Sequence, residues 1–375
     1  MKAIFLGAGA SCDCGMPLVW QLTAVIRKWL TKDKLKGFNQ NWKKQGQGWS
    51  DEIILRLNGL LDNEKIHYEQ IIGRLEDDFL KEGNEQKREE IHAVHSFLLD
   101  SVYELLLETQ VKNLSYTMSV LEGFKGLKKL VEESRPLWVF SLNHDLVLEL
   151  LAARLSIPVK SGFKEVVRIS MRSTMGEGQN FLSFERLSRE DIKRGQYKFF
   201  ESGEYGINLL KIHGSLDIFG QGDDLNYLKI LPINENPLSY VEQLEKVNTI
   251  NHNLVLSTRV RAINENVYLD DKGVEQFLRK SLLSGIYKFS KRVTQIAPPE
   301  FLELFKQYLN SVGELSCVGY GFGDKHINVI LRDWLSSSGE RRLSMINPKV
   351  EIPDTFNPLS KQITIIPKSA ADFLM

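Results

Sequence analysis

The segment Lys2-Ala3-Ile4-Phe5-Leu6-Gly7-Ala8-Gly9-Ala10-Ser11 decides the fold of this chain. Its apolar first half predicts a buried strand. Gly7 and Gly9 then allow a tight turn and a close approach of backbone N–H groups to a ligand. After Pro17, a periodic stretch predicts a helix, with one apolar face formed by Leu18, Leu22, Val25, Ile26 and Trp29. Strand, glycine turn and helix N-terminus together favour a pyrophosphate site.

Two features leave an alternative to this interpretation. Cys12 occupies the position of the third glycine in the usual dinucleotide-binding motif. A glycine turn can also do no more than close a strand–helix connection. The weight of the motif therefore depends on the residues that follow in the chain.

Length and composition limit the kind of protein this is. A chain of 375 residues predicts two or three units, or one domain with large insertions. The 48 basic residues equal the 48 acidic ones, so no charge excess favours a nucleic acid or a membrane surface as a partner. No cationic leader precedes an apolar core, and no apolar run approaches the length of a membrane span. We therefore expect a cytoplasmic protein.

Cysteine and histidine spacing gives little support for a metal site. The three cysteines, Cys12, Cys14 and Cys317, make neither a disulfide framework nor a four-thiolate zinc site. Packing beside the glycine turn is favoured for the first two. His92 and His95 are spaced like helical metal ligands, but His95 falls on an apolar stripe. A core or interface histidine is therefore favoured, and no metal is expected.

Strand and helix patterns alternate along much of the chain. Residues 18–133 predict a helical insertion, with an exposed loop at 32–50, and residues 217–296 predict a mixed insertion that ends in a helix at 274–289. A loop is expected at 173–179. Apolar runs that predict strands lie at 2–6, 137–141, 157–160, 207–212, 315–318, 343–346 and 363–366. This alternation predicts a doubly wound, parallel, Rossmann-like α/β sheet.

Five of these strands end in small or polar residues. The five ends are Gly7-Ala8-Gly9, Asn143-His144-Asp145, His213-Gly214-Ser215, Gly319-Tyr320-Gly321 and Asn347-Pro348. Each has a structural explanation: a helix cap for Asn143 or Asp145, a buried carbonyl partner for His213, a plain turn for the glycines. Because ligands bind at the carboxyl ends of parallel strands, five such ends on one sheet indicate a binding site.

These residues resemble the sirtuin family. Gly7-Ala8-Gly9-Ala10-Ser11, with Gly15 and Pro17, is similar to the opening of sirtuin-type domains. Asn143 and Asp145 resemble the Asn-x-Asp element, Ile212-His213-Gly214-Ser215 resembles the catalytic-histidine element, and Asn347 falls where sirtuins contact the adenosine ribose. The motifs occur in the sirtuin order, which implies a single NAD-binding domain over residues 1–375 with insertions.

The sequence differs from sirtuin deacylases in two respects, and these differences indicate which subgroup it resembles. Sirtuin deacylases hold a zinc ion with two cysteine pairs, which three cysteines cannot supply. Leu18-Val19-Trp20 stands where an Asp-Phe-Arg run is expected, and a helical block replaces the shorter cofactor loop. Together with the segment Gly319-Tyr320-Gly321-Phe322-Gly323-Asp324, these traits resemble the bacterial sirtuin-like NAD hydrolases of antiphage defence. That resemblance implies an enzyme that depletes NAD during infection.

The expected chemistry is cleavage of the nicotinamide–ribose bond of NAD, which here is the substrate. This reaction needs a positioned water, a base and oriented polar groups around the sugar. We assign His213 as the base and Asn143 to orientation of water or ribose. Asp145 positions its neighbours or caps a helix. The resemblance implies cofactor contacts from Gly7, Ala8, Gly9, Ala10, Ser11, Pro17, Gly214, Gly319, Tyr320, Gly321 and Asn347.

Other functions are open at this stage. A protein deacylase or ADP-ribosyltransferase uses the same cofactor, and a non-catalytic NAD or ADP-ribose sensor needs only the binding residues. A dehydrogenase is disfavoured because no acidic residue about 20 positions after Gly9 ends a second strand. An NAD hydrolase needs control, so the resemblance implies a homo-oligomer or a separate regulator, such as a HerA-like ATPase or an Argonaute-type protein. Residues 51–133 and 220–295 are the candidate assembly surfaces.

Overall fold

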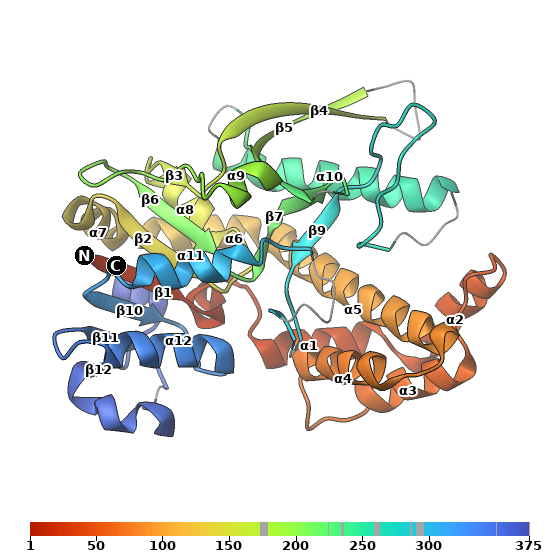
Figure 1. The fold of residues 1–375 in the computed structure, drawn as a ribbon, viewed down its shortest axis with the longest axis horizontal. Coiled ribbons are helices and arrows are strands. Elements are labelled where there is room, and N and C mark those ends of the chain that lie inside the picture. Colours follow the sequence, from red (N-terminus) through yellow and green to blue (C-terminus); the bar gives the residue numbers. More distant parts are fainter. Residues whose placement is uncertain are drawn as a thin grey trace.

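The computed structural model describes residues 1–172, 179–223, 225–233, 236–258, 263–285, 287–289, 296–349 and 351–374. Within these ranges the strands form two sheets. The larger is parallel, with the strand order β12 (Ile363–Ile366), β11 (Arg342–Ile346), β10 (Glu314–Val318), β1 (Lys2–Leu6), β2 (Leu137–Ser141), β6 (Ile207–Lys211) and β3 (Val159–Lys160). The predicted parallel α/β sheet is confirmed (Figure 1).

Strand β1 lies in the middle of this sheet because its side chains are apolar on both faces. Ala3 to Leu6 are all buried. The chain winds outward from β1 through β2 and β6, and later returns on the other side through β10, β11 and β12. The strand order thus reverses between β1 and β10, which is the position where such sheets bind ligands.

Helices cover both faces of the sheet. On one face, Phe5 and its neighbours pack against α11 (Glu300–Leu309) and α12 (Lys325–Ser336). On the other, Ile4 and Leu6 share a core with α7 (Gly126–Ser134), α8 (Val147–Arg154) and α13 (Ala370–Leu374). Apolar helix faces on both sides of a parallel sheet are the arrangement expected for a doubly wound fold.

Between β1 and β2 the chain forms a block of helices beside the sheet. Two short 3₁₀ turns (Ala8–Ala10 and Cys12–Cys14) are followed by α1 (Val19–Trp29), α2 (Lys32–Lys43), α3 (Asp51–Leu61), α4 (Tyr68–Lys81), α5 (Glu85–Lys112), α6 (Leu114–Val120) and, after a 3₁₀ turn at Leu121–Gly123, α7. Figure 1 shows α1 to α5 to one side of the parallel sheet, in red to orange. The predicted helical character of residues 18–133 is confirmed.

The loop predicted at residues 32–50 is wrong over most of its length, because α2 occupies Lys32–Lys43. The Thr31 hydroxyl caps this helix by accepting a hydrogen bond from the Lys34 N–H group. Leu35 is fully buried, and the Asn39 side chain hydrogen-bonds both the N–H and the carbonyl group of Trp49. The polar composition hid the helix because only a narrow face of α2 is apolar.

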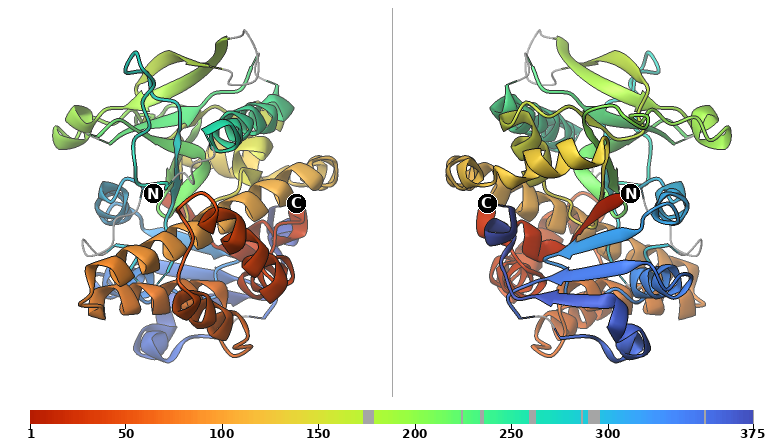
Figure 2. Two further views of the ribbon diagram at one scale, coloured as in Figure 1. Left: turned by 90° about the vertical axis from the view of Figure 1, so that its right-hand side faces the viewer. Right: turned by 90° about the vertical axis from the view of Figure 1, so that its left-hand side faces the viewer.

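The second sheet is antiparallel and lies above the first in Figure 1. Its order is β4 (Glu165–Arg172), β5 (Gln179–Leu187), β8 (Asn226–Ile230), β7 (Gly214–Gln221) and β9 (Arg279–Leu282), and it is accompanied by α9 (Arg189–Lys193) and α10 (Pro237–Thr258). Figure 2 shows this sheet and the C-terminal strands at opposite ends of the molecule. The loop expected at 173–179 lies outside the described residues, apart from Gln179 in β5.

The helix predicted at residues 274–289 is wrong where the structure describes this stretch. Arg279–Leu282 forms β9, which pairs with β7 in the register Gly214↔Leu282 and Ser215↔Ser281. Three of the four residues of β9 are polar although all four are buried, so pairing with β7 and not an apolar pattern accounts for the strand. A 3₁₀ segment at Asp354–Gln362 precedes β12. Within the described part of the chain, no helix is both long and apolar enough to cross a membrane.

Candidate active site at the carboxyl ends of the strands

The polar strand ends predicted from the sequence meet at one edge of the parallel sheet. The registers Leu6↔Val318, Leu6↔Ser141, Ser141↔Lys211 and Val318↔Ile346 place the last residues of β1, β2, β6, β10 and β11 side by side. The loops that carry the candidate residues all begin there. The prediction of a common edge is confirmed, whereas the binding roles of the residues stay predictions.

A first group of three candidate residues, which we call the Ser11 cluster, joins the ends of β1 and β2. It consists of Ser11, Asn143 and Asp145. The Asn143 amide donates from Nδ2 to Ser11 Oγ at 3.0 Å, and the Ser11 hydroxyl donates to Asp145 Oδ1 at 2.9 Å. No member is more than 8% exposed. Residues far apart in the chain thus form one buried hydrogen-bonded chain.

The Ser11 cluster also stabilises local structure. The Asn143 N–H group donates to Ser141 Oγ, and Asp145 Oδ1 accepts a hydrogen bond from the Val147 N–H group at the start of α8. Asp145 thus contacts both Ser11 and the first N–H group of α8, although the N-cap residue of this helix is Leu146. A helix start of this kind satisfies backbone N–H groups that would otherwise lack a partner.

The loops after β1 and β10 are in close contact, and this contact accounts for Gly7, Gly9 and Gly319. The Gly9 N–H group donates to the Gly319 carbonyl at 2.8 Å. A Cβ atom would lie 2.6 Å from Tyr320 Cα if added at Gly7, 2.8 Å from Gly319 O at Gly9, and 2.1 Å from Ala10 N at Gly319. Gly319 also has a φ of +63°, which favours glycine. Packing alone therefore requires these glycines.

The same contacts limit how a pyrophosphate could bind to the β1 loop. The N–H groups of Gly7, Gly9 and Ala10 donate to Val318, Gly319 and Gly7. The next helix, α1, begins only at Val19, after two 3₁₀ turns. The helix N-terminus is thus not directly continuous with the glycine turn. Ala8 is exposed, Gly9 is half-buried, and Pro17 is half-buried just before α1.

The candidate adenosine residues differ in their surroundings. Tyr320 is buried, its ring packs against Phe5, and its hydroxyl hydrogen-bonds Asn328 Oδ1 at 2.8 Å. Its side chain is therefore part of the core, and only its backbone borders the β1 loop. Gly321 is exposed, and Asn347, half-buried, accepts a hydrogen bond on Oδ1 from the Lys349 N–H group.

A second group, which we call the His213 cluster, follows β6 and consists of His213, Asp324, Lys288 and Glu69. His213 Nε2 lies 3.4 Å from Asp324 Oδ2, and the imidazole is 5% exposed. Nε2 is buried and has no hydrogen-bond partner among the described residues. Gly214 follows with a φ of +80°, and a Cβ atom there would lie 2.5 Å from Ser281 O.

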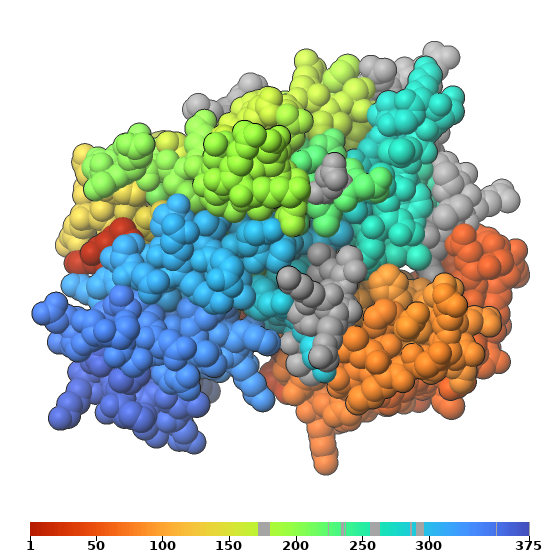
Figure 3. Space-filling view, in the orientation of Figure 1, coloured from red at the N-terminus to blue at the C-terminus, as the bar shows by residue number. Residues whose placement is uncertain are grey.

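Charged groups from three further elements surround this imidazole. Lys288 Nζ lies 3.2 Å from Asp324 Oδ2 and 2.8 Å from Glu69 Oε1 on α4. Asp324 Oδ1 accepts hydrogen bonds from the N–H groups of His326 and Ile327 at the start of α12. The Phe289 ring lies 5.6 Å from the His213 ring, between centroids. In Figure 3, cyan atoms from the stretch of chain that contains residues 287–289 are visible between the orange helical block and the blue C-terminal part.

The environment of His213 keeps its imidazole neutral. Burial lowers the pKa of His213 well below its usual value, and the nearby charge of Lys288, followed by His144 and His326, lowers this pKa further. The neighbouring His144 behaves alike, because burial and the charges of Lys288 and Lys211 lower its pKa to about 3. A neutral imidazole can accept a proton at pH 7.

Three of the four residues of the His213 cluster were not assigned a role from the sequence. Asp324 ends a turn motif singled out by its glycines, and its side chain is the cap of α12. Lys288 and Glu69 carry no sequence signal of their own. They reach His213 only through the packing of α4 and residues 287–289, where the Tyr287 hydroxyl also donates to Asp77 Oδ1.

A buried network of charges lies directly beneath the strand ends. Lys211 Nζ contacts the Asp145 carbonyl and lies 3.3 Å from Glu149 Oε1. Lys229 Nζ lies 3.5 Å from the same Glu149 oxygen and is paired with Asp217. Each of these side chains is at most 5% exposed. Their mutual pairing lets charges be buried that would be costly alone.

The two clusters are neighbours, but among the residues that the structure describes no hydrogen bond or ion pair joins Asn143 directly to His213. They follow adjacent parallel strands, and the intervening His144 ring lies 6.4 Å from the His213 ring, between centroids. The Leu216 N–H group also donates to the His144 carbonyl. The structure therefore brings the predicted base and the predicted amide to one edge, in separate hydrogen-bonded surroundings.

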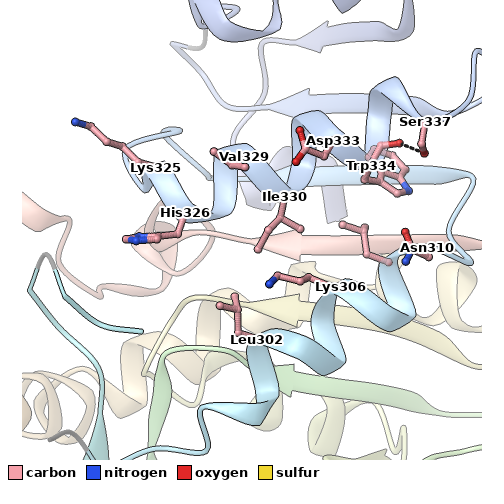
Figure 4. Close-up of a pocket in the computed structure, with 11 residues that line it drawn as sticks. Leu302, Lys306, Asn310, Lys325, His326, Val329, Ile330, Asp333, Trp334 and Ser337 are labelled. Atoms are coloured by element: carbon pink, nitrogen blue, oxygen red, sulfur yellow. Dashed lines mark hydrogen bonds between the residues drawn. The ribbon is translucent and has the colours of Figure 1, made fainter. Parts of the chain in front are cut away.

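A surface pocket of about 650 Å³ lies elsewhere, between α11 and α12 (Figure 4). Its floor is apolar and its rim carries charged side chains. Its lining consists of Leu302, Lys306, Leu309, Asn310, Lys325, His326, Val329, Ile330, Asp333, Trp334 and Ser337. None of the residues assigned from the sequence lines this pocket, although His326, whose N–H group donates to Asp324, lies on its border.

The histidines and cysteines considered for metal binding have other roles in the structure. His95 is buried with Nε2 3.4 Å from Glu76 Oε1, and the His92 ring is stacked on it at 6.4 Å between centroids. The predicted core position of His95 is confirmed. Cys14 is fully buried beside the glycine turn, and burial raises its pKa to about 12, so it is a packing residue.

Comparisons with known proteins give only distant similarities. No family model and no curated protein matches the sequence. Among solved structures, all of this chain and 86% of a Sir2 homologue bound to NAD align with 12% identity and a TM-score of 0.42. A mutant Sir2 homologue bound to 2′-O-acetyl-ADP-ribose aligns over 100% of this chain and 88% of its own, with 12% identity and a TM-score of 0.39.

A third solved structure, which comes from work on the structural basis of sirtuin substrate affinity, is similarly distant. It aligns over 100% of this chain and 91% of its own, with 13% identity and a TM-score of 0.40. At identities and TM-scores this low, the similarity identifies no activity, substrate or catalytic residue. The function is therefore argued from the residues of the site.

Proposed function

We propose that this protein is an NAD⁺ glycohydrolase that releases nicotinamide and ADP-ribose. One observation carries the proposal. A buried, neutral imidazole and a hydrogen-bonded amide, hydroxyl and carboxylate follow adjacent strands at the ligand-binding edge of a doubly wound sheet. The motifs that supply these groups, in the same order, resemble those of sirtuin-type domains.

The reaction needs one proton acceptor and little help for the leaving group. The bond between nicotinamide nitrogen and ribose C1′ breaks, its electron pair neutralises the pyridinium, and nicotinamide leaves uncharged. A water oxygen forms the new bond to C1′, and a proton of that water goes to His213. Proton transfer to a positioned side chain of this kind contributes about 10²- to 10⁴-fold to a rate.

The Ser11 cluster would orient the sugar and the water. Asn143 both donates and accepts hydrogen bonds, so it can hold a ribose hydroxyl and a water at once. Ser11 and Asp145 keep that amide in place, because the Ser11 hydroxyl links the other two side chains. Fixing the reactants in this way removes part of the entropic cost of the reaction.

We place the rest of the dinucleotide along the same edge of the parallel sheet, at the carboxyl ends of its strands. The exposed Ala8 and the loop around it border the reversal in strand order, where we place the pyrophosphate, and the exposed Gly321 and half-buried Asn347 border the adenosine side. The imidazole of His213 is buried and the Phe289 ring packs against it, so we propose that access of the ribose to His213 requires a local rearrangement. We propose that a homo-oligomer or a separate regulatory protein controls access, in antiphage defence, as the resemblance implies.

Product analysis tests the proposal. The purified chain is incubated with NAD⁺ alone, with NAD⁺ and an acetyl-lysine peptide, and with NAD⁺ and an acceptor protein, and the products are separated by chromatography. We expect equal amounts of nicotinamide and ADP-ribose from NAD⁺ alone. Product only in the presence of the peptide or the acceptor would support a deacylase or a transferase instead. Binding without any product in all three would support a sensor.

A further inference from the structure

Asp324 stands opposite His213 although it belongs to a distant strand end. Its Oδ2 atom lies 3.4 Å from His213 Nε2, and its side chain is 11% exposed. The ring nitrogen has no hydrogen-bond partner among the described residues. A buried polar atom without a hydrogen-bond partner is destabilising, and the carboxylate oxygen of Asp324 is the acceptor that faces this atom.

The Asp324 carboxylate is held rigidly and is charge-compensated. Oδ1 accepts from the N–H groups of His326 at 3.1 Å and Ile327 at 3.3 Å, which fixes the carboxylate at the start of α12. Oδ2 accepts from Lys288 Nζ at 3.2 Å, and Lys288 is in turn paired with Glu69. Oδ2 is therefore shared between an ammonium group and the imidazole.

We propose that Asp324 is a positioning residue for His213. Its carboxylate accepts the Nε2–H group and so keeps the ring in the tautomer in which Nδ1 carries no proton. The same carboxylate stabilises the imidazolium that forms when Nδ1 takes a proton from water. The inference deepens the proposed function and rests on it for the substrate. The tautomer itself does not depend on which substrate is bound.

The chemistry of the two groups determines the tautomer. A carboxylate can only accept hydrogen bonds, and a neutral imidazole carries one N–H group. The nitrogen that faces the carboxylate must therefore carry the proton if the two are to attract. Because the carboxylate is held by α12 and Lys288, a modest rotation of the imidazole ring is what would turn the 3.4 Å contact into a hydrogen bond.

Burial, together with the charges around His213, explains why one carboxylate does not keep the ring protonated. His144 follows β2, His326 lies on α12, and Lys288 approaches from residues 287–289, whereas Asp324 is the acidic group in contact with the ring. Lys288 opposes the field of Asp324 before the reaction. When Nδ1 takes a proton, the Asp324 oxygen compensates the new positive charge.

The test is the tautomer of His213 in ¹⁵N-histidine NMR spectra of the full chain at pH 7.5. The signal is assigned as the one missing in His213→Gln. Asp324→Asn is the test variant because asparagine caps helices about as well as aspartate. Asp333→Asn is the matched control, since Asp333 lies on the same helix with its side chain 62% exposed and away from His213.

We expect the Nε2–H tautomer in the wild type and in Asp333→Asn, and a mixture of tautomers in Asp324→Asn. An Nδ1–H tautomer in the wild type overturns the proposal, even if Asp324→Asn fails to fold. An unchanged tautomer in a folded Asp324→Asn protein overturns it as well. Neither result depends on NAD cleavage, so failure of the proposed function would be recognised separately by the product analysis.

Kinetics add a second readout if NAD⁺ is cleaved. We expect Asp324→Asn to lower kcat on the order of 10²-fold with KM little changed, because Asp324 acts on the proton transfer. Lys288→Met should move the acid limb of the pH–rate profile to higher pH, since Lys288 lowers the His213 pKa. Equal kcat values for Asp324→Asn and the wild type would contradict the assignment.

Discussion

The Ser11 cluster and the His213 cluster lie at the ends of adjacent strands but differ in how their polar atoms are satisfied. In the Ser11 cluster each side chain hydrogen-bonds the next, and Asp145 also accepts a hydrogen bond from the Val147 N–H group. In the His213 cluster, Nε2 lacks a hydrogen-bond partner among the described residues. The contacts of the Ser11 cluster stabilise the fold whether or not a ligand binds, whereas the buried Nε2 atom of His213 is left with a charged neighbour, Asp324, and no hydrogen bond from the part of the chain that the structure describes.

The largest expected effect is the loss of turnover in His213→Ala, and comparing this variant with Asn143→Ala shows whether each cluster serves catalysis, stability or both. His213→Ala should lower kcat for NAD⁺ about 10³-fold because the proton acceptor is lost, while the unfolding free energy stays within about 1 kcal/mol. Asn143→Ala should lower both the rate and the stability, the latter by about 1–2 kcal/mol, because it removes a partner of the buried Ser11 hydroxyl. Steady-state kinetics and urea unfolding measure the two effects.

His252→Ala is the control for this comparison, since His252 is exposed on α10. It should change neither quantity. If His213→Ala retained wild-type turnover, or if it lost stability while Asn143→Ala did not, the division of roles between the clusters would be wrong.

A pair of glycine substitutions tests the contact that holds the two clusters together. Gly319→Ala places a Cβ atom 2.1 Å from Ala10 N in a residue with φ of +63°. We expect it to lower the unfolding free energy by about 2 kcal/mol or more. Gly321→Ala meets nothing within 4 Å, so its effect should be below about 0.5 kcal/mol. Equal stability losses in urea unfolding would contradict the loop contact.

The smallest effect concerns the pH dependence of stability. The folded chain keeps His213 neutral well below the usual pKa, whereas the unfolded chain takes up a proton near pH 6.5. Because the unfolded state then binds more protons, the contribution of His213 to the unfolding free energy is greatest above pH 6.5 and decreases as the pH is lowered. Between pH 6.5 and 5.5, His213→Gln should lose about 1 kcal/mol less than the wild type. Parallel losses in both proteins would contradict a neutral His213.

Patterns within single elements allowed most of the fold to be predicted. Buried strands such as β1 and β2 are short apolar runs bounded by glycine or polar residues, and their order suffices for a doubly wound sheet. The errors came where tertiary contacts decide. Helix α2 is polar except for a narrow buried face around Leu35, and β9 owes its strand conformation to pairing with β7.

The candidate site was predictable to the same extent. Asn143, Asp145 and His213 follow strands directly, so strand-end reasoning finds them. Lys288 and Glu69 could not be found this way, because they lie on elements whose packing against α12 no local pattern encodes. The glycines of the β1 loop show the opposite case. Their motif suggested a ligand, and the structure shows a loop contact that requires them regardless.

A crystal structure of His213→Ala with NAD⁺ tests the central claim most directly, since the substitution removes the proton acceptor and leaves Asn143 in place. We predict the nicotinamide ribose between Asn143 and the position of the missing imidazole, with the pyrophosphate near Ala8. Nicotinamide ribose bound away from both residues, or an edge that stays filled by the protein's own side chains at saturating NAD⁺, would contradict the account.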